Sequence, residues 1–112
     1  MEVIETLNKE VTTKDKIYEY EYRLIKGKFS MVYGYEVNVM QSYGIEVERK
    51  DIIDNKVVNI ERDNIKNISV DKNKVHNLME ILYNNIVSPI HFIEVIGEYV
   101  DQLVLDFDVN CK

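Results

Sequence analysis

The chain has 112 residues, of which 46% are hydrophobic and 30% are charged, so it is long enough for one domain with its own core and too short for two. It carries 14 basic and 20 acidic residues, a net charge of −6, which disfavours binding to bare nucleic acid or to an anionic membrane. Cys111 is the only cysteine and no apolar run approaches the length of a membrane span. We therefore expect a single cytoplasmic domain over residues 1–112, without an internal disulfide.

The N-terminal two-thirds of the chain alternates apolar and polar residues with the period of two that is typical of half-buried β-strands. The clearest case begins at Ile17, where Tyr18, Tyr20 and Tyr22 alternate with charged residues and therefore share one face of the predicted strand. Residues 1–16 are less regular and are expected either to add an edge strand or to remain flexible.

Short glycine- and asparagine-containing segments predict where these strands turn or bend. Lys26-Gly27-Lys28 predicts a tight turn, because glycine reaches positive φ without steric cost. Gly34, within the alternating run that follows, predicts a bulge or a close backbone approach, and Asp54-Asn55-Lys56 predicts a second turn. The result is an antiparallel β-meander of three to five strands, centred on residues 17–62.

The period changes to 3.6 in the last third of the chain, where a pair of helices is predicted over residues 71–104. Asp71 can cap the first helix by accepting from free backbone N–H groups, and Ser88 followed by Pro89 is a start signal for the second. The tail, residues 105–112, alternates again and predicts a short strand or a frayed end. The fold class is therefore α+β, a meander followed by two antiparallel helices packed on one sheet face.

The second predicted helix carries more apolar residues than one sheet face can cover. Its polar side is a narrow stripe that contains Glu94, Glu98 and Asp101, whereas Phe92 and Tyr99 belong to the broad apolar side. The helix is therefore either wedged between the sheet and the first helix or in contact with a second chain.

The charge of the chain is concentrated in its C-terminal third. Residues 75–112 hold one basic and six acidic residues, a net of −5, and such a field attracts a partner with a basic surface. We therefore predict a non-catalytic protein-interaction or regulatory module that uses the second helix. The candidate partner-binding residues are Phe92, Glu94, Glu98, Tyr99 and Asp101. A homodimer through residues 89–104 would use the same surface.

No group of residues in the sequence predicts catalysis, a cofactor or a metal. His91 shares a helix face with Glu94 and Glu98, but the sequence lacks H-E-x-x-H and any cluster of cysteines and histidines. Cys111 lies near acidic residues, which disfavour its thiolate. The four glycines form no phosphate-binding pattern, and Gly97 predicts close packing of the helix instead. We expect no enzymatic activity, no cofactor and no metal site.

The tyrosine-rich strands leave two alternative functions open. Tyr18, Tyr20 and Tyr22, with Tyr33 and Tyr35 of the adjacent strand, would line a small-ligand pocket between the sheet and the helices, or form a surface that stacks nucleic-acid bases. The acidic balance disfavours the nucleic-acid alternative. Packing of the rings beneath the helices, with their hydroxyls at the edge, is the simpler interpretation of the pattern.

Several short motifs resemble one family of small bacterial proteins. The segments Tyr43–Val47 (YGIEV), Asn67–Ser69 (NIS) and Val87–His91 (VSPIH) occur in this order and resemble the DUF6514 family, to which no function is assigned. The resemblance covers roughly residues 17–104. It implies a shared scaffold and a bacterial source, and it implies no activity.

Overall fold

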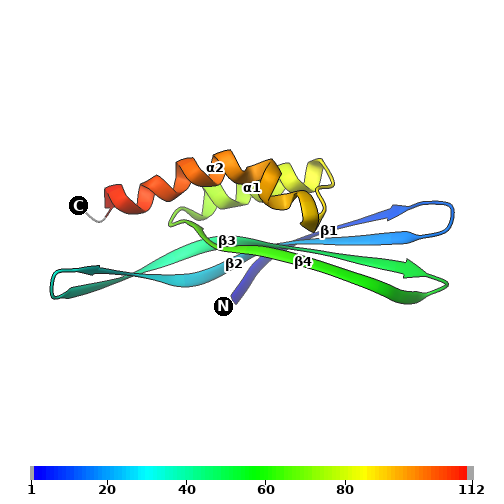
Figure 1. Cartoon of the computed structure of the whole chain (residues 1–112), viewed down its shortest axis with the longest axis horizontal. Coiled ribbons are helices and arrows are strands. Elements are labelled where there is room, and N and C mark those ends of the chain that lie inside the picture. Colours follow the sequence, from blue (N-terminus) through cyan, green and yellow to red (C-terminus); the bar gives the residue numbers. More distant parts are fainter. Residues whose placement is uncertain (1, 111–112) are drawn as a thin grey trace.

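The computed structural model describes residues 2–110 of the chain and the side chains of residues 2–101. The elements in chain order are β1 (Glu2–Thr12), β2 (Ile17–Tyr33), β3 (Glu36–Ile53), β4 (Lys56–Ser69), α1 (Lys72–Asn84) and α2 (Pro89–Asn110). The strands form one antiparallel sheet in the order β1-β2-β3-β4, and both helices lie on the same face of it (Figure 1). The predicted α+β meander with two helices on one face is therefore confirmed.

The molecule is long and narrow, with extents of 58 × 22 × 19 Å, because the strands extend past the helices at both ends (Figure 1). The β1–β2 and β3–β4 hairpins project at one end and the β2–β3 hairpin projects at the other. β1 begins opposite Lys26 and β4 ends opposite Tyr43, so residues 27–42 form a two-stranded hairpin. We call residues 27–42 the arm, and the helices with the sheet beneath them the body.

Two of the predicted turning points are wrong and one is confirmed. β2 runs straight through Lys26-Gly27-Lys28, and the chain turns instead at Gly34, whose φ is +60°. Gly34 is therefore a turn residue and not a bulge. The period-2 alternation continues across Gly27, and that alternation outweighs the turn preference of a single glycine. Asp54 and Asn55 form the second predicted turn, with φ of 51° and 64°.

The secondary structure at both ends of the chain differs in part from the sequence prediction. Residues 2–12 form an edge strand, so the flexible alternative for this segment is wrong. α2 continues to Asn110, so the strand predicted within residues 105–112 is wrong up to that residue, and residues 111–112 lie outside the described chain. A helix that has already nucleated gains one hydrogen bond for each residue added, whereas a new strand needs a partner.

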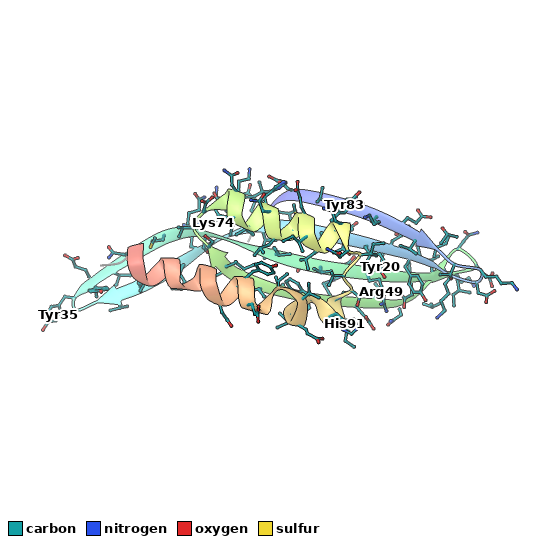
Figure 2. The ribbon with its side chains drawn as sticks, turned by 90° about the horizontal axis from the view of Figure 1, so that it is seen from above. Tyr20, Tyr35, Arg49, Lys74, Tyr83 and His91 are labelled. Atoms are coloured by element: carbon teal, nitrogen blue, oxygen red, sulfur yellow. The ribbon has the colours of Figure 1, made fainter. Side chains whose placement is uncertain are left out.

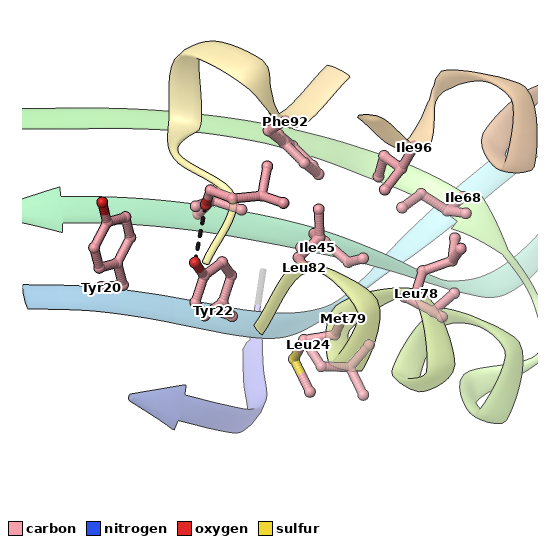
Figure 3. Close-up of a cluster of buried hydrophobic side chains, with 13 residues drawn as sticks. Tyr20, Tyr22, Leu24, Ile45, Ile68, Leu78, Met79, Leu82, Phe92 and Ile96 are labelled. Atoms are coloured by element: carbon pink, nitrogen blue, oxygen red, sulfur yellow. Dashed lines mark hydrogen bonds between the residues drawn. The ribbon is translucent and has the colours of Figure 1, made fainter. Parts of the chain in front are cut away.

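The core lies between the sheet and the two helices (Figure 3). The predicted helix stripe is confirmed as buried at Val75, Leu78, Met79 and Leu82. The same predicted stripe includes Tyr83, which is only partly buried, and Ile86, which lies beyond the end of α1 and is 40% exposed, so the prediction is wrong at Ile86. Each fully buried side chain of this size contributes about 1.5–3 kcal/mol to stability. Among the described side chains, the cluster consists of Tyr20, Tyr22, Leu24, Ile45, Val47, Ile68, Val75, Leu78, Met79, Leu82, Val87, Phe92 and Ile96.

Tyr20 and Tyr22 of β2 pack beneath the helices, as the simpler interpretation of the tyrosine pattern predicted, whereas that prediction is wrong for the exposed Tyr33 and Tyr35. The rings of Tyr20 and Tyr22 are parallel, with centroids 6.2 Å apart. The Tyr22 hydroxyl donates a hydrogen bond of 2.9 Å to the carbonyl of Val87 (dashed in Figure 3). Burial raises the pKa of this hydroxyl, as does the neighbouring Tyr20. Tyr22 therefore ties the sheet to the segment that joins α1 to α2.

That segment begins with a tight ending of α1. The Val87 N–H donates to the Leu82 carbonyl at 3.0 Å and the Ile86 N–H donates to the Tyr83 carbonyl at 3.3 Å, the two bonds of a Schellman motif. The motif requires a left-handed residue, and here that residue is Ile86 with φ of 51°. A β-branched residue is strained in this conformation. At the other end of α1, the Asp71 carboxylate accepts from the Asn73 N–H at 2.9 Å, which confirms the predicted cap.

A bulge in β4 sits directly against β3. Tyr43 pairs with Ser69 and Ile45 pairs with Ile65, so three residues of β4 lie opposite Gly44 alone. A Cβ atom added to Gly44 would overlap the carbonyl oxygens of Ile65 and Lys66. Gly44 is therefore required by this close approach. The bulge lets β4 turn the side chain of Ile68 into the core.

Candidate interaction surfaces

The side chains that pack beneath α2 determine which side of the helix faces solvent. Pro89 is the first residue of the helix, as predicted, and Phe92 and Ile96 are both 0% exposed. α2 packs along β4 and beside α1 (Figure 2). Because the inner side chains leave the helix no freedom to rotate about its axis, the residues on the opposite side are held toward solvent.

The structure separates the five candidate partner-binding residues into two groups. Phe92 lies in the core and is not available to a partner, so its assignment to the contact surface is wrong. Glu94, Glu98, Tyr99 and Asp101 are exposed, and Tyr99 keeps 49% of its surface in water. The sequence placed both Phe92 and Tyr99 on the apolar side of the helix. Only packing against the sheet distinguishes the buried Phe92 from the half-exposed Tyr99.

The same surface contains apolar residues that the sequence reasoning did not select. Ile90 is 73% exposed, and Ile93 and Val95 are also exposed. The excess width of the apolar side was visible in the sequence, but which part of it remained uncovered was not. Gly97 also behaves differently from the expectation, because a Cβ atom added there would meet nothing within 4 Å. The prediction of close packing at Gly97 is therefore wrong.

The charged side chains described on this helix, over residues 89–101, are acidic apart from His91. The Nδ1 atom of His91 lies 3.7 Å from a carboxylate oxygen of Glu94, and both side chains are largely exposed. An exposed pair of this kind contributes little to stability. We call Ile90, Ile93, Glu94, Val95, Glu98, Tyr99 and Asp101 the α2 surface. At helical spacing its carboxylates form a central acidic stripe, with Ile93 on one side of the stripe and Val95 and Tyr99 on the other.

A second group of charges joins β1 to α1. His76 contacts Glu5 through Nδ1 at 2.5 Å and Glu80 through Nε2 at 2.8 Å, and Lys72 lies 3.3 Å from Glu5. Hydrogen bonds donated to the carboxylates of Glu80 and Glu5 favour the charged imidazolium and raise the pKa of His76. Partial burial opposes the shift at Glu5, but His76 and Lys72 lower its pKa. Next to this group, Lys9 donates to the Tyr83 carbonyl at 2.8 Å and lies 4.0 Å from the centroid of that ring. These contacts fasten the edge strand to the helix.

A third group of charges lies on the sheet face opposite the helices. Glu48 is 3% exposed and is held by Arg62 at 2.6 Å and by Arg23 at 3.4 Å, while Arg23 also contacts Glu46 at 2.7 Å. Burial opposes ionisation of Glu48, but the two arginines lower its pKa. Each carboxylate in this group is matched by a guanidinium, so we interpret it as a structural ion network. Sequence reasoning missed it because the partners lie on three different strands.

The small-ligand pocket and the nucleic-acid-binding surface, the two alternatives left open by the sequence, gain no support from the described residues. The described part of the space between the sheet and the helices is filled by buried side chains. An open hollow of about 650 Å³ lies instead at the base of the arm, lined by residues that include Lys26, Lys28 and Gln41. Tyr33 and Tyr35 lie at the tip of the arm, away from the buried Tyr20 and Tyr22, so the tyrosines form no common platform.

Two further searches of the described residues bear on metals and membranes. No group of three or more histidine, cysteine, aspartate or glutamate side chains among them is arranged to hold a metal ion. Neither helix, as far as it is described, is long and apolar enough to cross a bilayer.

Comparison with known proteins identifies the family. The family model DUF6514, a family of unknown function, matches residues 1–102. The chain therefore belongs to this family, as its short motifs suggested. No curated protein and no solved structure matches the chain.

Proposed function

We propose that this member of the DUF6514 family is a non-catalytic protein-interaction module that binds a basic partner surface through the α2 surface. The observation that carries the proposal is the exposure of Ile90, Ile93, Val95 and Tyr99 on a helix that Phe92 and Ile96 anchor in the core. Single exposed apolar residues are common, but four on one helix, on both sides of the acidic stripe of Glu94, Glu98 and Asp101, form a mixed apolar and acidic surface that suits a basic partner.

The two kinds of residue in this surface have different roles in binding. Tyr99 has a large apolar ring and a polar hydroxyl, and tyrosine is enriched among residues that dominate binding energy. The carboxylates of the acidic stripe are exposed and contribute mainly to the association rate and to partner selection. Because Phe92 and Ile96 already fix the helix in the core, binding does not require the surface to become ordered.

The experiment compares two variants with the same change in net charge. The first variant reverses the charge of the acidic stripe of α2 with the substitutions Glu94→Lys, Glu98→Lys and Asp101→Lys. In the matched control, Glu10→Lys, Asp15→Lys and Glu19→Lys reverse three exposed acids of the β1–β2 hairpin. Each tagged protein is used to capture partners from a lysate of the source cells, and captured proteins are quantified by mass spectrometry.

The proposal expects a stoichiometric partner that is retained by the control and lost by the α2 variant. Tyr99→Asp leaves Glu94, Glu98 and Asp101 unchanged, and it is expected to weaken the same complex by about tenfold or more. Retention of every partner by both α2 variants, with their folds intact, would contradict the proposal and leave the acids as a feature that favours solubility.

A further inference from the structure

Gly97 lies within α2, where glycine destabilises a helix more than any other residue except proline. Two other glycines of the chain have a clear structural reason: Gly34 has a positive φ in a turn, and Gly44 faces backbone oxygens of β4. Neither reason applies to Gly97, because its φ is not positive and a Cβ atom added there would meet nothing within 4 Å. No contact among the described residues therefore requires a glycine at this position.

Gly97 continues a line of exposed apolar residues along α2. Ile90, Ile93 and Gly97 are spaced i, i+3 and i+7, which places them within about 60° of one another around the helix. Ile90 is 73% exposed and Ile93 is 46% exposed. A long side chain at residue 97 would hold another chain away from this line, whereas glycine lets that chain come close. We call these three residues the glycine strip.

The acidic stripe of α2 lies directly beside the glycine strip. Its three carboxylates lie roughly 20–80° around the helix from Ile90, on the side away from Ile93. Residues 89–101 contain no lysine or arginine. A partner that covers the strip and the stripe together therefore needs an apolar line with a line of positive charges beside it.

The surface is hollowed where the glycine strip meets β4. An open hollow of about 400 Å³ beside Ile90 is also lined by Ile60 of β4, which is 50% exposed. Residues 61–63 of β4 complete this side of the hollow with two acids and Arg62, which Glu48 holds at 2.6 Å. A hollow at the end of an apolar strip can seat a large apolar side chain of a partner.

We infer that the partner of the α2 surface contributes a basic amphipathic α-helix, which lies along the glycine strip with its positive side chains over the acidic stripe. A helix presents two neighbouring lines of side chains with the period of α2 itself, whereas a β-strand presents a single line of every second residue. The distance between packed helices depends on the side chains between them, so Gly97 permits a close approach.

This inference rests on the proposed function and adds to it the class of partner and the side of α2 on which that partner lies. Tyr99 is across the acidic stripe from the glycine strip and remains for another part of the partner.

The test uses two fluorescent peptides of about 18 residues, both composed of leucine and lysine in equal numbers. In one peptide the leucines recur with the period of about 3.5 that favours a helix, and in the other leucine and lysine alternate as in a strand. Fluorescence anisotropy measures the affinity of each peptide for the full chain. The wild type is expected to bind the helical peptide at least about tenfold more tightly than the alternating one. Equal affinities, or no binding of the helical peptide, would overturn the inference.

Gly97→Gln fills the middle of the strip without changing the net charge. It is expected to weaken binding of the helical peptide by about tenfold, while the thermal unfolding temperature stays the same or rises, because nothing lies within 4 Å of the added Cβ atom. Gly27→Gln is the matched control in β2, where an added Cβ atom also meets nothing within 4 Å, and it should bind as the wild type does. Ile90→Gln, at a largely exposed side chain, is expected to weaken binding by about fivefold and keeps the test decisive if Gly97→Gln does not fold.

The charge-reversed variant of the acidic stripe separates this inference from the proposed function. Its binding of the helical peptide should be lost, whereas the control variant of the β1–β2 hairpin, with the same change in net charge, should bind as the wild type does. Loss of binding on charge reversal with full binding by Gly97→Gln and Ile90→Gln would overturn the inference and leave the proposed function standing. Full binding by the charge-reversed variant as well would contradict both.

Discussion

β2 and β3 run through both the body and the arm, yet the same strands have opposite surroundings in the two regions. In the body, Tyr22 is 0% exposed beneath the helices, whereas in the arm Tyr35 is fully exposed and Val37 is 63% exposed. Alternating residues are therefore sufficient to extend the ladder past the core, where the side chains at the tip of the arm remain in water. The comparison teaches that packing against the helices holds the strands in the body, whereas the backbone ladder carries more of the stability at the tip of the arm.

The largest expected effect is on the free energy of unfolding, and it compares a glycine of β3 in the body with a glycine of β2 in the arm. Gly44→Ala should destabilise the protein by about 3 kcal/mol or more, because the new Cβ would overlap backbone oxygens of β4 that cannot move without dissolving the bulge. Gly27→Ala should be neutral or stabilise by about 0.5 kcal/mol, because nothing lies within 4 Å of the added atom. Urea unfolding monitored by circular dichroism measures both. Equal stabilities of the two variants would break the distinction between body and arm.

The next largest effect on the free energy of unfolding compares the buried Tyr22 with the exposed Tyr35. Removing the buried hydroxyl with Tyr22→Phe should cost about 1–2 kcal/mol, because the Val87 carbonyl loses its donor inside the core. Tyr35→Phe is the control at the tip of the arm, where the ring is fully exposed, and it should change the free energy of unfolding by less than about 0.5 kcal/mol. A Tyr22→Phe protein as stable as the wild type would show that water replaces the hydroxyl and that the segment after α1 is not held by this bond.

A smaller effect of opposite sign is expected within the body. Ile86→Gly should stabilise the protein by about 1 kcal/mol, because glycine adopts the left-handed conformation at the end of α1 without strain. Ile86 is 40% exposed, so its side chain contributes only part of its apolar surface to the core. Thermal unfolding of the wild type and the variant measures the difference. Destabilisation would mean that the packing of Ile86 outweighs the strain of its backbone.

The smallest effect depends on pH and concerns the junction of β1 and α1. His76 has a raised pKa in the folded protein, so its ion pairs stabilise fully below its ordinary value of 6.5 and lose their contribution as the pH rises through the raised value. The pKa of Glu5 is lowered, so its part is present above 4.5 and is lost as the pH falls. The advantage of the wild type over His76→Gln should therefore be about 0.5 kcal/mol larger near pH 6 than near pH 9. An advantage that grows with pH in denaturant titrations would contradict this assignment.

Local patterns were sufficient for much of the body. Period-2 alternation predicted the strands, Asp71 and Pro89 marked the helix starts, and the stripe from Val75 to Leu82 marked the buried side of α1. Each of these signals is contained within one element, where side-chain spacing alone determines which residues share a face.

The signals that failed depend on tertiary structure. Gly27 and Gly34 are equivalent as turn residues, and the choice between them depends on where β3 can pair with β2. Phe92 and Tyr99 belong to the same side of α2, and only the extent of the sheet beneath the helix separates buried from exposed. The Arg23–Glu48 contact joins residues 25 positions apart in the sequence, and nothing in either segment indicates it.

The central claim is that buried side chains stabilise the strands of the body, whereas the exposed tip of the arm, over residues 32–39, is held mainly by the backbone ladder between β2 and β3. Amide hydrogen exchange tests this claim most directly. The account predicts that the ladder amides of the body are strongly protected and that those of residues 32–39 exchange much faster. Protection of residues 32–39 equal to that of the body would contradict it.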